Sequence, residues 1–260
     1  MLKFPAIGIW RPGQITVSWT QSSRPVIPQV EELIEQAWLA GTQKIGRHLF
    51  DGPMCRMESF DARDGQLALT FSRTSYKPFW GTNLNHPEIA EEFGAAALAN
   101  PVGASALLIS SDGFLLMGRR NNSVAYYPGR VHPFAGAIEP SDNLDVFEEV
   151  RRELREELSL TPKDVSEILC LGIAEDQSLR QPELIFAVRT KRTREQIEAN
   201  LEPTEHQSVW TTSATQESVE KALGGDEWFT PVAVAALALV GRNLFGIEWF
   251  DKTRGPAGRR

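Results

Sequence analysis

The sequence predicts an α/β fold in which a mixed sheet carries helices on its faces. Strand-like apolar runs stand before and after one strongly acidic helical segment, and further helical segments follow it. Short strands and one helix near the start of the chain predict a smaller α+β subdomain. We therefore expect this subdomain over residues 1–95, a main domain over residues 96–250 and a flexible tail over residues 251–260.

Length and composition are those of an ordinary globular protein. The 260 residues are 42% hydrophobic and 23% charged, which suffices for one good core with a smaller attachment. The net charge of -7 argues against a nucleic acid polymer as a partner, because a phosphate backbone requires a basic surface. An anionic small molecule remains possible if a metal ion and a few arginines neutralise it.

The sequence also indicates a compartment. The longest apolar run, residues 232–240, is too short to span a membrane, and no signal-peptide core is recognisable at the N-terminus. Cys55 and Cys170 show no CxxC spacing, so we expect a reduced, cytoplasmic setting. Nothing in the sequence indicates an oligomeric state.

The expected elements follow from local patterns. Residues 3–20 hold two strand-like pieces around a Pro-Gly turn, and residues 30–40 have helical spacing of apolar side chains. Runs 54–60 and 66–71 flank an Asp-Gly pair, which predicts a hairpin. The strands expected in the second half cover residues 102–110, 114–118, 168–174, 183–188 and 209–212, and helices are expected from Thr193 and over residues 231–245.

The stretch from Gly136 to Leu160 carries the strongest functional signal. On a helix the apolar side chains form one ridge, made of Val146, Val150, Leu154 and Leu158. The acidic side chains form a parallel ridge, made of Glu149, Glu153 and Glu157, with Glu156 at its edge. Like charges four residues apart destabilise a helix by roughly 0.2 to 0.5 kcal/mol per pair. A divalent cation would relieve this repulsion. A solvated helix balanced by arginines is the alternative that spacing leaves open.

This stretch resembles the Nudix box: a Gly, five residues, an acid, seven residues, and R-E-U-x-E-E-x-G-U with U apolar. Residues 152–160 match the second half, with Ser159 in place of Gly. Gly136 and Asp142 match the first half, but nine residues instead of seven precede Arg152. The resemblance implies a Nudix α/β/α sandwich and metal-dependent cleavage of a diphosphate linkage. We expect the longer loop before Arg152 to affect substrate specificity more than the metal site.

The resemblance also implies roles for the acids. Glu153 and Glu157 would hold Mg2+, with Mn2+ as the alternative, because carboxylates are hard oxygen ligands. Glu156 would be a third ligand or the general base. Glu205, beside His206 in an expected loop, is a second candidate for the base, and the sequence leaves this choice open.

Further segments resemble one branch of the family, the UDP-sugar diphosphatases. They include Leu49-Phe50-Asp51, Thr74-Ser75-Tyr76, Gly81-Thr82-Asn83, residues 100–103 and 112–115, Arg119-Arg120 and Glu139-Pro140. By this resemblance Phe50 and Tyr76 would line a uridine pocket, and Arg120, Ala125, His132 and Glu139 would lie along the nucleotide. His132 replaces an acid of the family, and Ala135 a Gly.

Residue chemistry alone leaves other interpretations for these segments. Phe50 could be a core residue, and residues 74–83 could form a packed loop. If the base is uracil, backbone groups near Ala125 or a side chain such as Asn83 would have to read its edge, because stacking does not distinguish bases.

The function implied by the resemblance is hydrolysis of UDP-glucose or UDP-galactose to UMP and a sugar 1-phosphate. The expected partner is thus a small nucleotide sugar, with neither a nucleic acid polymer nor a membrane involved. One alternative is another nucleoside diphosphate derivative, such as ADP-ribose or a dinucleotide. The other is a Nudix-like domain that binds a nucleotide or a protein without turnover.

Overall fold

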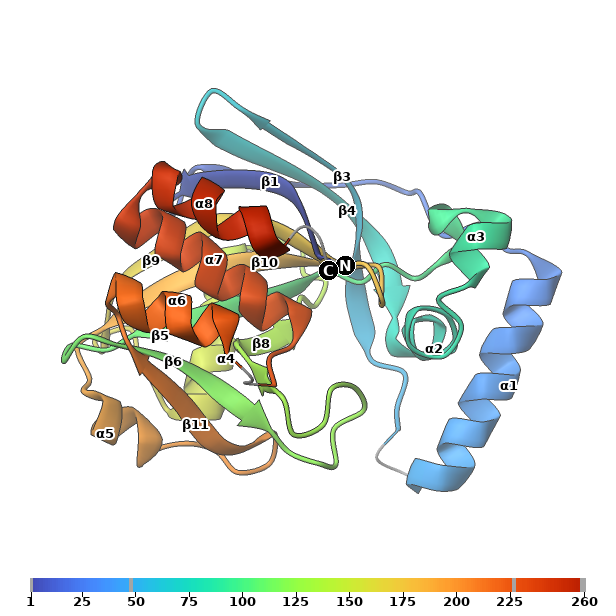
Figure 1. Cartoon of the computed structure of the whole chain (residues 1–260). Helices are drawn as coiled ribbons and strands as arrows, with labels where there is room; N and C mark the ends of the chain where they lie inside the picture. Colours follow the sequence, from blue (N-terminus) through green and yellow to red (C-terminus); the bar gives the residue numbers. More distant parts are fainter. Residues whose placement is uncertain (1, 47–48, 226–227, 258–260) are drawn as a thin grey trace.

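The computed structural model describes residues 2–46, 49–225 and 228–257. A large sheet is covered by helices on both faces, and a second group of helices lies beside it (Figure 1). The predicted mixed α/β architecture is confirmed. Among the described residues, no helix is long and apolar enough to cross a membrane.

The main sheet has eight strands and forks in its middle. Its order is β1 (Leu2–Trp10), β9 (Val165–Asp176), β10 (Gln181–Thr190), β5 (Gly103–Ile109), β6 (Phe114–Arg120) and β11 (His206–Ser213). β10 and β5 are parallel, and the other neighbours are antiparallel. β8 (Phe134–Ala137) pairs with the first half of β5, whereas β6 pairs with its end. β7 (Val131–His132) pairs with β6, so the fork between β6 and β8 leaves a place for polar side chains.

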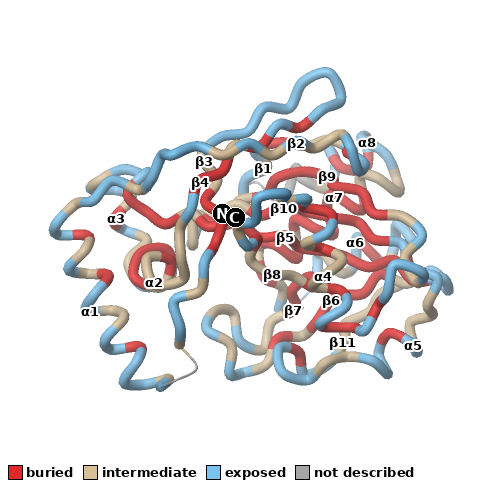
Figure 2. Tube along the Cα trace, turned by 180° about the vertical axis from the view of Figure 1, so that it is seen from behind, coloured by how far each residue is buried: buried red, intermediate tan, exposed pale blue. Residues whose placement is uncertain are grey.

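Helices bury both faces of this sheet. α4 (Val146–Leu158) packs on one face, and α6 (Gln216–Gly224), α7 (Pro231–Phe245) and α8 (Ile247–Ala257) pack on the other, with the short α5 (Arg194–Glu198) at the side (Figure 1). The apolar ridge predicted for α4 is buried at all four positions, which confirms that prediction. The burial of α7 is confirmed as well, and Figure 2 shows the central strands buried between the two layers.

The ends of α4 are defined by local chemistry. Asp145 caps its N-terminus, because the side chain accepts a hydrogen bond from the backbone of Phe147 at 2.8 Å. Ser159 follows the helix with φ +54°, the left-handed conformation in which the family's Gly is favoured. Serine in that conformation costs no more than about 1 kcal/mol, so the helix keeps its end.

The N-terminal part adds a three-stranded sheet and a helical group. β2 (Ile15–Trp19) is parallel to β4 (Gln66–Ser75), which is antiparallel to β3 (Pro53–Arg63). α1 (Pro28–Ile45) lies beside α2 (Tyr76–Phe79), the π-helical turn η2 (Trp80–Leu84), α3 (Ile89–Phe93) and the short η3 (Ala95–Ala97). β1 differs from expectation, because it pairs with β9 of the main sheet. The division of the chain at residue 95 stays a prediction.

Several helices were not expected from the sequence. The segment 76–97 is largely helical, and α6 and α8 are additional elements. α8 continues to Ala257, so residues 251–257 are helical; the flexibility expected of the tail stays a prediction, and residues 258–260 lie outside the described residues. Trp249 and Phe250 hold this helix in place by packing on Phe245 and Phe4.

Buried hydrogen bonds join the N-terminal part to the main domain. The fully buried Asn83 donates to the carbonyl of Leu179 at 2.8 Å and accepts from the backbone of Ala99 and Asn100 at 3.1 and 3.2 Å. Its polar atoms are therefore committed to the protein, and the expectation that Asn83 reads a base is wrong. Arg56, also buried, donates to the carbonyls of Leu98 and Ala96 and so ties β3 to η3 within the N-terminal part.

Replacing Asn83 by alanine should lower the free energy of unfolding by roughly 1 to 3 kcal/mol. The backbone N–H of Asn100 would lose its acceptor, whereas that of Ala99 keeps the hydroxyl of Thr82 at 3.1 Å. Urea unfolding at constant pH measures this loss. Asn85→Ala is the matched control, because Asn85 makes one exposed hydrogen bond, and we expect a loss below about 1 kcal/mol. Equal losses would contradict the role given to Asn83.

Candidate functional site

α4 presents its glutamates at three different depths. The side chains of Glu153 and Glu157 are 13% and 6% exposed, whereas that of Glu156 is 57% exposed. Arg152 lies among three of these acids, with its guanidinium 3.0 Å from Glu149, 2.6 Å from Glu153 and 3.1 Å from Glu156. Arg152 thus balances the negative charges of these three glutamates. Glu157 contacts a different group of residues.

Glu153 lies against the backbone of β8. A Cβ atom on Gly136 would be 2.0 Å from its Oε1, so only glycine lets the carboxylate approach the strand this closely. Burial raises the pKa of Glu153 to about 7, Arg152 opposes this increase, and the charge of Glu157 adds to it. The Gly that opens the Nudix-like motif therefore makes room for one of its acids.

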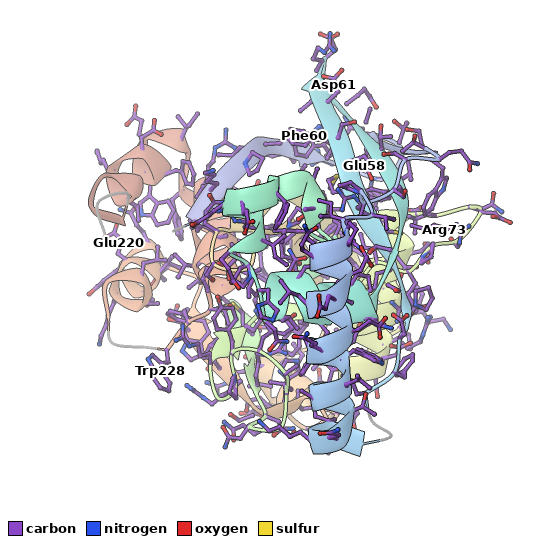
Figure 3. All side chains as sticks on the ribbon, turned by 90° about the vertical axis from the view of Figure 1, so that its right-hand side faces the viewer. Glu58, Phe60, Asp61, Arg73, Glu220 and Trp228 are labelled. Carbon is purple, nitrogen blue, oxygen red and sulfur yellow. The ribbon has the colours of Figure 1, made fainter. Side chains whose placement is uncertain are left out.

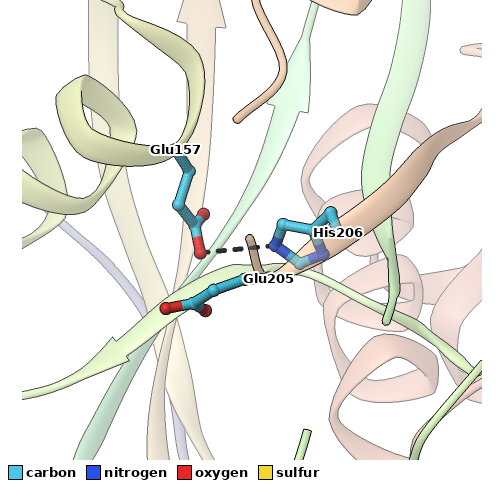
Figure 4. A group of neighbouring side chains, drawn as sticks. All are labelled: Glu157, Glu205 and His206. Carbon is cyan, nitrogen blue, oxygen red and sulfur yellow. Dashed lines mark hydrogen bonds and ion pairs between the residues drawn. The ribbon is translucent and has the colours of Figure 1, made fainter. Parts of the chain in front are cut away.

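Glu157 forms a compact cluster with Glu205 and His206 (Figure 4). One ligand atom from each residue lies within 4.8 Å of the others, and Oε1 of Glu157 is 3.3 Å from Nε2 of His206. Glu205 is exposed and precedes β11, whereas His206 is the first residue of that strand and is buried. The expected loop at His206 is therefore wrong, and the sequence analysis did not assign His206 a role.

The electrostatics of this cluster favour a cation. Burial raises the pKa of Glu157 well above its ordinary value, and the charge of Glu205 raises it further. Burial also lowers the pKa of His206 to about 4, so its imidazole is neutral near pH 7. Among the described residues, Oε2 of Glu157 is buried without a hydrogen-bond partner. Carboxylate oxygens in this state fit a hard divalent cation, which would hold both acids in their ionised form.

A glycine leaves room for this cluster, as Gly136 does for Glu153. Gly118 on β6 faces the ring of His206, and a Cβ atom there would lie 2.2 Å from Nδ1. The adjacent acid and imidazole, Glu205-His206, are the only local signal of this part of the site. Gly118 faces the His206 ring because β6 pairs with β11 in the sheet, and the local sequence does not show this pairing.

Arg120 is a buried cation beside the cluster. Its Nε donates to the carbonyl of Tyr126 at 3.2 Å, and its guanidinium lies 4.6 Å from the centre of the Tyr126 ring. It forms no ion pair with any described residue, although it is only 7% exposed. A guanidinium in this position has donors available for an anionic group.

A pocket of about 380 Å³ lies between the N-terminal part and the main domain. It brings together Phe50, Tyr76, Ala125 and Glu139, four of the residues predicted to contact substrate. Ala137, at the end of β8, joins its wall. The ring of Tyr76 is held by edge contacts with Trp38 and Phe79, whereas Phe50 is 71% exposed and is not a core residue.

His132 does not join this pocket. The structure places it inside the protein, with Nδ1 2.8 Å from the hydroxyl of Thr230, the residue that caps α7. Burial lowers its pKa well below the ordinary value, so the ring is neutral. The expected position of His132 along the nucleotide stays a prediction.

Glu183 is a buried carboxyl that the sequence analysis missed. It accepts a hydrogen bond from Ser105 at 3.0 Å, and Gly103 leaves room for it, because a Cβ there would lie 2.3 Å from its carboxylate. Burial raises its pKa to about 8. On the sequence it stands in an apolar strand, where its only signal is a charge in an otherwise buried run.

Known proteins are similar to this chain over much of its length. The family model of the NUDIX domain matches residues 99–233. The chain is similar to human uridine diphosphate glucose pyrophosphatase NUDT22, with 29% identity over 88% of this chain and 87% of that protein. The Bos taurus protein of the same name is 30% identical over 75% and 79% of the two chains. A solved protein from Deinococcus radiodurans superposes with a TM-score of 0.41 and 20% identity, over 52% of this chain and 80% of that one.

Glu183→Gln should remove a pH-dependent loss of stability. Between the ordinary carboxyl pKa of 4.5 and about 8, the unfolded chain ionises Glu183 and the folded protein does not, so the free energy of unfolding falls as pH rises. We expect a wild-type loss on the order of 2 to 5 kcal/mol from this residue. Chemical unfolding of both proteins at pH 5 and pH 8.5, without metal, measures the difference.

The control for that experiment is Glu195→Gln, which removes one exposed negative charge on α5. Its unfolding free energy should follow the wild type at both pH values. If Glu183→Gln also follows the wild type, Glu183 is ionised in the folded protein and its assigned pKa is wrong.

Proposed function

The chain belongs to the Nudix family, and on that premise we propose that it hydrolyses the diphosphate linkage of a UDP-sugar, UDP-glucose or UDP-galactose, to UMP and a sugar 1-phosphate. The observation that carries the proposal is the pocket in which Phe50 and Tyr76 lie opposite Ala125 and Glu139. The relatives named uridine diphosphate glucose pyrophosphatase support the choice of substrate, because the similarity extends over most of both chains.

Glu153 and Glu157 are the proposed ligands of a divalent cation, Mg2+ or Mn2+. Such a cation, when bound, neutralises phosphate charge and makes a water molecule more acidic. The two side chains lie one helical turn apart, are largely buried, and have raised pKa values without a cation. Arg152 orients Glu153 through their ion pair, and His206 lies at Glu157.

Glu205 is the proposed general base. Its carboxylate lies in the cluster with Glu157 and is open to solvent, so it can accept a proton from an attacking water molecule. Glu156 is the weaker candidate, because its side chain faces solvent and pairs with Arg152. Arg120 supplies donors to the diphosphate, and the aromatic side chains hold the base.

Substitution of the two ligands should abolish turnover without unfolding the protein. Glu153→Gln and Glu157→Gln should each reduce kcat at least about 100-fold, because a neutral amide is a poor ligand for Mg2+. Release of sugar 1-phosphate from UDP-glucose, with and without Mg2+, measures this loss, and thermal melts check the fold. Glu148→Gln is the control on the same helix, since Glu148 is exposed and pairs with Arg151. Wild-type rates in either ligand variant would refute the metal assignment.

A second prediction concerns the base pocket. Tyr76→Ala should weaken UDP binding by roughly 1 to 3 kcal/mol, the usual contribution of stacking on an aromatic ring. Tyr76→Phe keeps the ring and should bind UDP like the wild type. Calorimetric titration of UDP and of Mg2+ separates the two sites, because the metal affinity should not change.

Two outcomes would contradict this assignment. Equal affinity of Tyr76→Ala and the wild type for UDP would mean that the base lies elsewhere. Tighter binding of ADP than of UDP by the wild type would favour an ADP-linked substrate, such as ADP-ribose or a dinucleotide.

A further inference from the structure

A second hollow lies on the surface between β2, β4 and the loop that precedes α4. Its volume is about 480 Å³, and it is lined by Trp19, Thr20, Gln21, Ser22, Ser23, Arg73 and Asp142. We call it the Trp19 hollow. Figure 3 shows Arg73 at the edge of the molecule beside β3 and β4. None of these residues takes part in the site described above.

The walls of the Trp19 hollow are held by packing, and the polar atoms of its charged side chains are available for hydrogen bonds. The indole of Trp19 packs on Phe71 at 6.2 Å with the rings at 71°, and the backbone N–H of Thr20 donates to the carbonyl of Phe71 at 2.9 Å. The guanidinium of Arg73 lies 5.5 Å from the Trp19 ring. Within the described parts of the chain, the side chains of Arg73 and Asp142 form neither hydrogen bonds nor ion pairs.

This combination of groups matches a neutral polyol. Arg73 donates hydrogen bonds and Asp142 accepts them, and a sugar hydroxyl can do both. An indole ring offers an apolar surface against which the C–H groups of a sugar ring can pack. A phosphate would be repelled by Asp142, and an organic cation by Arg73. The hydroxyl and amide groups of residues 20–23 add further hydrogen-bonding capacity.

The Trp19 hollow and the base pocket are lined by the same two segments of the chain. Arg73 stands three residues before Tyr76, and Asp142 three residues after Glu139. Arg73 is opposite Cys55 in the β3–β4 pair, and the backbone of Cys55 donates to the carbonyl of Ile138 at 2.8 Å.

A buried thiol reports the same proximity. Burial raises the pKa of Cys55 to about 12, and the charges of Glu149, Arg73 and Glu139 also act on it. Glu149 lies one helical turn before Glu153 on α4. Cys55 therefore links the strand that carries Arg73 to the segment that carries Glu139, through the strand pairing and the hydrogen bond to Ile138.

We propose that the Trp19 hollow is the subsite for the hexose of the substrate. A nucleotide sugar carries its base and its sugar on opposite ends of the diphosphate, and the two hollows offer one place for each. The inference rests on the proposed function. Asp142 belongs to the loop whose length differs from the Nudix pattern. In this proposal, that loop therefore supplies a contact to the hexose that determines substrate specificity.

The test compares a ligand that has the hexose with one that lacks it. The Michaelis constant for UDP-glucose should rise about 5- to 20-fold in Arg73→Gln and in Trp19→Ala, while the inhibition constant of UDP stays within about twofold of the wild type. Asp142→Asn should act in the same direction. Arg63→Gln is the control, because Arg63 is exposed on the same sheet and pairs only with Asp61.

The outcomes separate the two proposals. If Arg73→Gln and Asp142→Asn leave the UDP-glucose constant unchanged, or change both constants equally, the hexose subsite is refuted even if Trp19→Ala fails to fold. If the wild type does not hydrolyse UDP-sugars, the proposed function fails. Calorimetry with Mg2+ then decides the subsite by itself: UDP-glucose must bind more tightly than UDP to the wild type, and the advantage must vanish in Arg73→Gln.

Discussion

Crowding of buried carboxyl groups is the constraint on which the site depends. Glu153 and Glu157 lie on one side of a single helix and Glu205 approaches from the start of β11, so burial and then the charge of Glu205 raise the pKa values of the two helix carboxyl groups. The neutral imidazole of His206 and the guanidinium groups of Arg152 and Arg120 limit the electrostatic cost of bringing these carboxyl groups together. Those groups do not reach both oxygens of Glu157, which is the position where a cation would contribute most.

Space for these groups comes from glycines and not from an empty cavity. Gly136 faces Glu153, Gly118 faces His206, and Gly103 faces Glu183. In each case a methyl group would overlap the buried polar side chain, so exchanging the glycine would displace a titratable group before it disturbed the sheet. A glycine inside a strand usually makes the strand less stable. In this protein three strands contain such a glycine, and each glycine leaves room for a polar side chain.

The sequence predicts those parts of the fold that depend on local periodicity. The four-residue spacing in α4 identified its buried ridge, and family resemblance brought Phe50, Tyr76, Ala125 and Glu139 to one pocket. Side chains whose environment depends on distant strands could not be read in this way. His132, Asn83 and Glu183 look like ordinary polar residues until pairing and packing bury them. Likewise, a tail is expected from residue 251, whereas the helix that begins at Ile247 extends to Ala257.

The arrangement divides chemistry and recognition between two parts of the chain. The acidic helix and β11 hold the groups suited to a metal ion, and the N-terminal part contributes aromatic walls to both hollows. Recognition of this kind requires the parts to keep a fixed separation, since a displacement of about 1 Å can cost a large share of the rate. The buried hydrogen bonds of Asn83 join the two parts. They bind nothing themselves, yet the position of the base relative to the acids depends on them.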